Sequence, residues 1–170
     1  MLRKPATLQP LWLILLLLIL LCGQPVMAAK EGDRFDDWTV GCEKLGEGDK
    51  AQDRCFIYQT VVNNDTDQPV LQVAIGYLPG DNKPAAILTV PLGVVLPAGM
   101  GISVDDSETI RIPYERCVPK GCIAGIPLDD KIIGQFKRGL KAKVLLHDGT
   151  QRIALPVSLK GFTKGFDALR

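Results

Sequence analysis

The sequence is poor in histidine and has no excess of charge of either sign. It contains one histidine, which excludes metal sites built from several histidines and mechanisms that need two imidazoles. Lys and Arg number 20 and Asp and Glu number 19, so the formal net charge is only +1. Coating nucleic acid requires a strongly basic surface, and we therefore expect no nucleic-acid partner. With 46% hydrophobic and 23% charged residues, the 170-residue chain is typical of one globular domain.

Catalytic and metal-binding motifs are lacking as well. The single histidine, His147, precedes Asp148 and Gly149 and is expected in an exposed turn. None of the serines lies in a Gly-x-Ser-x-Gly elbow; they are Ser103, Ser107 and Ser158. The acidic turns at 65–67 and 105–108 do not have the spacing of a calcium loop. We therefore predict a protein that is not an enzyme and that needs no metal or cofactor.

The N-terminal segment has the features of a secretory signal peptide. Arg3 and Lys4 precede an unbroken apolar run at 11–22, and small residues follow before Ala28. We predict a signal peptide at 1–28 with cleavage after Ala28, and Ala29 as the alternative site. An uncleaved anchor and a lipidated Cys22 remain open, although the apolar run is shorter than a bilayer core. Cleavage leaves no stable membrane span.

Cleavage would also leave an even number of cysteines. The four that remain are Cys42, Cys55, Cys117 and Cys122. Four cysteines allow three pairings, and the spacing favours the local ones, Cys42 with Cys55 and Cys117 with Cys122. Zinc is disfavoured because twelve residues separate the first two cysteines, and thioredoxin-like chemistry is disfavoured because four separate the last two. An exported chain with paired cysteines favours structural disulfides.

Short segments rich in β-branched and aromatic residues, separated by turn formers, predict an all-β sandwich. The expected strands cover residues 38–42, 55–62, 70–77, 85–90, 93–96, 102–104, 109–114, 122–127, 141–146 and 151–157. One helix is predicted at 129–138, with Asp129 as its N-cap, and a second short helix at the C terminus. We expect a loose lead-in at 29–37 and one folded domain at 38–170. Trp38 is expected in the core.

Four segments together give the chain a family resemblance. They are Asp-Trp-Thr-Val-Gly-Cys at 37–42, the Pro- and Gly-rich segment at 91–99, Cys-Val-Pro-Lys-Gly-Cys at 117–122, and the segment at 155–162. In this order they resemble the invasion-associated locus B family over the whole predicted mature chain. The resemblance implies an exported bacterial protein with an immunoglobulin-like β-sandwich, two disulfides at the matching cysteines and no assigned enzymatic activity. Founding members are linked to entry into host cells, whereas many relatives occur in bacteria that do not invade.

Two segments are candidates for contact with a partner. The first is a basic cluster near the predicted helix, formed by Lys131, Lys137, Arg138, Lys141 and Lys143. It is either a solvated helix face or a surface for an anionic partner such as a glycan. The second is the apolar segment 91–100, which is either a buried corner or an exposed patch for a protein. We predict a binding module that contributes to host-cell attachment or invasion, with a periplasmic structural or chaperone-like factor as the alternative. The expected location is the periplasm, the outer membrane or the cell exterior.

Overall fold

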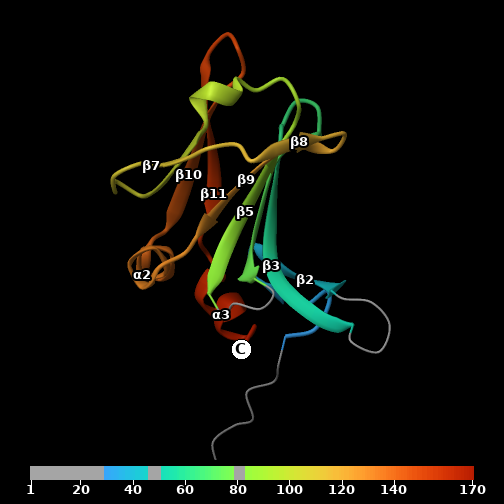
Figure 1. The fold of residues 1–170 in the computed structure, drawn as a ribbon. Helices are drawn as coiled ribbons and strands as arrows, with labels where there is room; N and C mark the ends of the chain where they lie inside the picture. Colours follow the sequence, from blue (N-terminus) through green and yellow to red (C-terminus); the bar gives the residue numbers. More distant parts are fainter. Residues whose placement is uncertain (1–28, 46–50, 79–82) are drawn as a thin grey trace, which may run out of the picture.

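The computed structural model describes residues 29–45, 51–78 and 83–170 (Figure 1). The predicted signal peptide at 1–28 lies outside the described residues. The strands are β1 (Arg34–Phe35), β2 (Trp38–Leu45), β3 (Gln52–Val62), β4 (Pro69–Tyr77), β5 (Pro84–Val90), β6 (Met100–Val104), β7 (Ile110–Ile112), β8 (Arg116–Val118), β9 (Gly121–Pro127), β10 (Lys141–His147) and β11 (Arg152–Ser158). The helices are η2 (Leu96–Ala98), α2 (Asp130–Arg138) and α3 (Phe162–Asp167).

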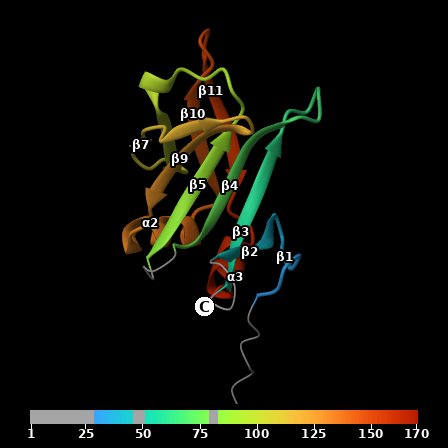
Figure 2. The same cartoon turned by 45° about the vertical axis from the view of Figure 1, so that its right-hand side comes forward.

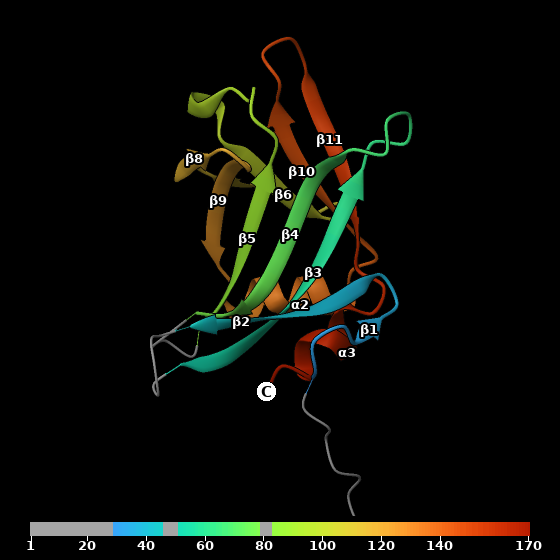
Figure 3. The same cartoon turned by 90° about the vertical axis from the view of Figure 1, so that its right-hand side faces the viewer.

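The strands form two antiparallel sheets that pack face to face. The larger sheet has the order β1-β2-β3-β4-β5-β9-β8, and the smaller one has the order β11-β10-β6-β7. Figures 2 and 3 show β3, β4 and β5 crossing over β10 and β11, with α2 and α3 at one end of the sandwich. The predicted fold class, an all-β sandwich with two short helices, is confirmed.

The core lies between the sheets because alternate residues of each strand point inward. On β4 these are Leu71, Val73 and Ile75, which are all buried. Trp38, at the start of β2, has an exposed fraction of 0%, and its Nε1 donates a 3.0 Å hydrogen bond to the carbonyl oxygen of Ser158. The prediction that Trp38 is a core residue is confirmed.

Both predicted helices are present. The Asp129 side chain accepts a 2.7 Å hydrogen bond from the Ile132 amide, so it caps α2 as expected. The aromatic side chains on the inner faces of the two helices are buried: Phe136 of α2, and Phe162 and Phe166 of α3. The Phe162 ring packs edge-on to Trp38 and closes one end of the sandwich.

The structure differs from the sequence prediction at residues 93–96. We predicted a strand there, but the chain runs as a loop into η2. Pro91 and Pro97 lack the amide proton that a ladder needs, and Gly93 has a φ of 103°. The Val95 amide instead donates to the carbonyl of His147 at 2.9 Å. The prediction of a strand at 93–96 was wrong because it gave more weight to the β-branched residues of this segment than to its prolines and glycine.

Two smaller regions also hold more structure than the sequence suggested. The short strand β8 precedes β9 and pairs with it across the turn at 119–120. The segment 29–37, expected as a loose lead-in, contains β1, which pairs with β2. The Ala29 amide also donates to the carbonyl of Ala168 at 2.9 Å, which ties this segment to the C-terminal helix.

Two disulfides join directly opposed residues of neighbouring strands. Cys42 of β2 is bonded to Cys55 of β3, and Cys117 of β8 to Cys122 of β9. These are the local pairs that the spacing favours. Both bonds lie within the larger sheet, so each one staples a hairpin and neither joins the two sheets.

Candidate binding surface

The predicted basic cluster is divided between two elements in the structure. Lys131, Lys137 and Arg138 lie on α2, whereas Lys141 and Lys143 lie on β10. Lys131 is exposed in the first turn of the helix, and the guanidinium of Arg138 folds back over Gly134. The five side chains therefore do not form one continuous patch on the helix.

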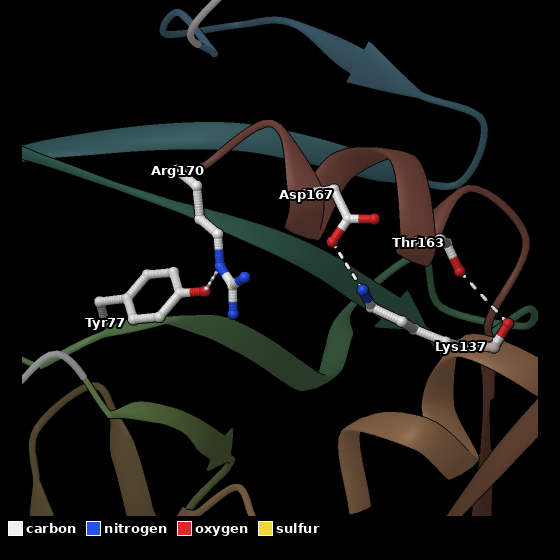
Figure 4. Close-up of polar contacts among 5 residues, drawn as sticks. All are labelled: Tyr77, Lys137, Thr163, Asp167 and Arg170. Atoms are coloured by element: carbon white, nitrogen blue, oxygen red, sulfur yellow. Dashed lines mark hydrogen bonds and ion pairs between the residues drawn. The ribbon is translucent and has the colours of Figure 1, made fainter. Parts of the chain in front are cut away.

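Lys137 is already engaged within the molecule (Figure 4). Its Nζ lies 2.6 Å from Oδ1 of Asp167 and 5.7 Å from the centre of the Phe166 ring. The Thr163 hydroxyl donates to the Lys137 carbonyl oxygen at 3.2 Å. These contacts join α2 to α3, so the charge of Lys137 is balanced and its role is structural. It is a poor candidate for contact with an anionic partner.

The C-terminal residue makes a second contact between α3 and the sandwich. Arg170 Nε donates a 2.7 Å hydrogen bond to the Tyr77 hydroxyl at the end of β4, and its guanidinium lies 5.9 Å from the centre of the same ring. Together with the Lys137–Asp167 pair, this contact ties α3 to α2 and to β4 of the larger sheet.

Lys141 and Lys143 point away from the core. The side chains of β10 alternate, with Ala142, Val144 and Leu146 buried and the two lysines exposed on the outer face of the smaller sheet. Near the start of this strand the carboxylate of Asp105 accepts hydrogen bonds from the amides of Leu140 and Lys141. Within the described residues neither lysine ammonium forms an ion pair.

The structure adds three residues to this outer face that the sequence analysis did not connect with the cluster. Arg111 of β7 lies opposite Gly101 of β6, which lies opposite Leu145 of β10. His147 of β10 lies opposite Arg152 of β11. Opposed residues project to the same face, so these side chains share the face of Lys141 and Lys143. We call this surface the basic face; it consists of Arg111, Lys141, Lys143, His147 and Arg152.

Alternation along each predicted strand indicated which residues share a face, but it did not place the strands beside one another. Arg111 and Arg152 are separated by 40 residues and by two intervening strands in the sheet. Only the observed register brings them to one surface.

The prediction for His147 was an exposed turn residue, and the structure places it at the end of β10, half-buried beside the turn. Its Nδ1 accepts a 3.0 Å hydrogen bond from the Gly149 amide, so Nε2 carries the proton in the neutral ring. The neighbouring Asp148 carboxylate accepts hydrogen bonds from the Gln151 amide and from the Thr150 hydroxyl and amide, which lower its pKa to about 2.

The serines make contacts elsewhere. The Ser107 hydroxyl accepts from the Val104 amide, and the Ser158 hydroxyl accepts from the Lys160 amide. Ser103 is buried on β6. Among the residues that the structure describes, no three His, Cys, Asp or Glu side chains are grouped so that they could hold a metal ion.

The apolar segment 91–100 is partly exposed and partly buried. Leu92 has an exposed fraction of 58% and Leu96 of 49%, whereas Met100 is buried in the core. Leu92 and the exposed Val62 lie at a cleft of about 570 Å³ between the ends of the two sheets. The interpretation as an exposed patch therefore applies to Leu92 and Leu96, and the interpretation as a buried corner applies to Met100.

Comparison with known proteins identifies the family. A profile of the invasion associated locus B (IalB) protein family matches residues 38–170, which is most of the chain. The chain belongs to the invasion associated locus B family. The match confirms the resemblance seen in the sequence. It spans both sheets and both α-helices, so the basic face lies entirely within the family domain.

Individual members of the invasion associated locus B family agree with this assignment. An invasion protein B homologue of Brucella abortus is 28% identical over 140 residues, which are 81% of this chain and 78% of the homologue. Invasion protein B of Bartonella bacilliformis is 29% identical over 121 residues, or 71% of this chain and 62% of that protein. The crystal structure of invasion associated protein B from Bartonella henselae superposes with a TM-score of 0.69 at 24% identity and covers 81% of this chain and 92% of that one.

No helix within residues 29–45, 51–78 and 83–170 is long and apolar enough to cross a membrane.

Proposed function

We propose that this chain is an exported binding module without enzymatic activity, and that it contacts an anionic partner through the basic face. The observation that carries the proposal is the placement of Arg111, Lys143 and Arg152 on one sheet face, where none of them has an ion-pair partner among the described residues. Cations that are not neutralised within the fold remain available to an external anion. The partner we favour is an anionic glycan at the bacterial envelope or on a host cell.

Export and attachment rest on separate support. The predicted signal peptide and the two disulfides suit a protein that folds in an oxidising compartment. The relatives carry names that associate them with invasion. We extend this association to the present chain as a contribution to contact with a host or envelope surface, in which the smaller sheet presents the basic face.

The test is a charge reversal on β10. The double variant Lys141→Glu and Lys143→Glu should elute from a column of immobilised heparin, used as a model anionic glycan, at lower salt than the wild type. The difference in heparin affinity between the variant and the wild type should shrink as salt rises, because exposed charges are screened over about 8 Å at physiological ionic strength. Reversal at Lys137 and Arg138 would be a poor test because Lys137→Glu would face Asp167 and loosen α3.

The matched control is the double variant Lys44→Glu and Lys120→Glu, which changes the net charge equally. Lys44 lies on β2 of the larger sheet, and Lys120 lies in the turn between β8 and β9. The elution of this control should change far less than that of the β10 variant. Equal shifts for the two variants would mean that only net charge matters, and the assignment of the basic face would then fail.

A second candidate function is a periplasmic envelope factor with a structural or chaperone-like role. The exposed Val62 and Leu92 at the cleft between the sheets favour it, because such a factor needs accessible apolar surface. Protease treatment of intact cells separates the candidates. A displayed module is digested, whereas a periplasmic factor is protected until the outer membrane is opened.

A further inference from the structure

One end of the basic face is hollowed. The hollow has a volume of about 490 Å³ and lies beside η2, where β6, β7, β10 and β11 end. Its polar walls are formed by Thr109 and Arg111 on one side and by His147 and Arg152 on the other, with Leu145 and the backbone of Gly101 beneath.

The hollow exists because the central strand carries no side chain at its floor. Gly101 lies between Arg111 and Leu145 in the sheet, and a Cβ added there would come within 2.7 Å of the Thr109 methyl group. Gly99, which follows η2 and directly precedes this strand, has a φ of 66°, and a Cβ there would lie 2.9 Å from the Ile112 carbonyl oxygen. Glycine is therefore favoured at Gly99 by its backbone conformation, and a side chain at Gly101 would have to displace the Thr109 methyl group.

The charges around the hollow are of one sign. Among the residues that the structure describes, no aspartate or glutamate lines it. Arg111 Nη2 donates to the Ala98 carbonyl oxygen at 2.9 Å, which fixes the guanidinium at the rim and leaves its other donors available. The carboxylate of Asp148, which follows His147, is held by hydrogen bonds within its own turn and lines the cleft between the sheets instead.

The donors suit an oxyanion. A guanidinium presents paired N–H groups that match the geometry of a carboxylate or a sulfate, and two of them border this hollow. The His147 ring adds an N–H donor at Nε2, since its Nδ1 accepts from the Gly149 amide, and Thr109 adds a hydroxyl. The space far exceeds that of a bare inorganic anion, so it accommodates the body that carries the charged group as well.

We propose that this hollow binds an acidic sugar residue, with its carboxylate or sulfate held between Arg111 and Arg152. The inference deepens the proposed function and rests on it: the lysines of β10 attract an anionic glycan, and the hollow selects one acidic residue of it. The selection comes from shape and from paired donors, whereas the attraction comes from charge alone.

The test measures binding of a sulfated, uronic-acid-containing disaccharide of the heparin type by titration calorimetry, using the exported, disulfide-bonded protein. Arg111→Gln and Arg152→Gln should each weaken binding by about tenfold or more, since each removes charge-assisted hydrogen bonds. The control Arg116→Gln, an exposed arginine of β8 on the larger sheet, should change binding less than about twofold. Unchanged thermal midpoints show that the variants fold. Within the described part of the chain the Arg152 side chain makes no ion pair, so Arg152→Gln remains informative if Arg111→Gln proves unstable.

Three outcomes overturn the proposal. The first is that inorganic sulfate binds as tightly as the disaccharide. The second is that all three variants lose the same amount of affinity for the disaccharide. The third is that the disaccharide does not bind, whereas vesicles with anionic lipids bind and need the same arginines. Failure of the hollow is distinguishable from failure of the proposed function. If the disaccharide does not bind but the β10 reversal still lowers retention on heparin, the basic face stands without the hollow.

Discussion

At the scale of single residues, the aromatic side chains that close the end of the sandwich are the least replaceable. Trp38 is completely buried, and its ring centre lies 5.5 Å from that of Phe162 in an edge-to-face arrangement. Its indole also supplies the hydrogen-bond donor for the Ser158 carbonyl group at the end of β11. One side chain therefore joins β2, α3 and the edge of the smaller sheet.

Replacement of Trp38 by alanine should be strongly destabilising. Trp38→Ala leaves a cavity and removes one of the two side-chain hydrogen bonds to the Ser158 carbonyl oxygen, and we expect the free energy of unfolding to fall by about 3–5 kcal/mol. Chemical denaturation followed by circular dichroism measures the change. A loss below about 1 kcal/mol would mean that the ring does not pack as the structure places it.

At the scale of elements, the contact between the N-terminal strand and the last helix depends on a glycine. Gly161 precedes α3 with a φ of 86°, and a Cβ there would lie 1.9 Å from the carbonyl oxygen of Phe35 in β1. The close approach lets β1 pack against the start of α3. The helical spacing of Phe162, Phe166 and Leu169 predicted a terminal helix, but it did not show that residues 29–37 would lie against it.

Gly161→Ala tests this contact against a matched control. Gly149→Ala also places alanine at a positive φ, 97°, but nothing lies within 4 Å of its Cβ position. The control should lose about 1 kcal/mol from backbone strain alone, and Gly161→Ala should lose about 3 kcal/mol or more because the clash adds to that strain. Thermal unfolding of both variants measures the difference. Equal losses would contradict the close packing of β1 on α3.

At the scale of the whole molecule, the fold class was predictable because strands such as β4 and β10 carry their own alternation and α2 carries its own cap. The Asp129 cap and the inward face of β4 are local signals, and both were read correctly. The hollow was not predictable, because Arg111, His147 and Arg152 meet only through the register of four strands. Residues 93–96 were misread because their apolar β-branched composition resembles that of a strand.

Export and oxidation can be checked together on the intact protein. We expect the mass of the exported protein to match a chain that begins at Ala29. This mass should be lower than that of the reduced chain by the four hydrogen atoms lost in forming two disulfides. A non-reducing peptide map should link Cys42 to Cys55 and Cys117 to Cys122. Retention of residues 11–22, or a crossed link, would refute the predicted processing or pairing.

The hydrogen bond between the Ala29 amide and the Ala168 carbonyl has a consequence for orientation. It places Ala29, the first described residue, beside Ala168 near the C terminus, at the end of the sandwich opposite η2 and the β10–β11 turn (Figure 1). A tether, fluorescent reporter or affinity tag fused at either side therefore leaves from the same base. Immobilised through that base, the protein would present the end that carries Arg152 outward, toward whatever surface it meets.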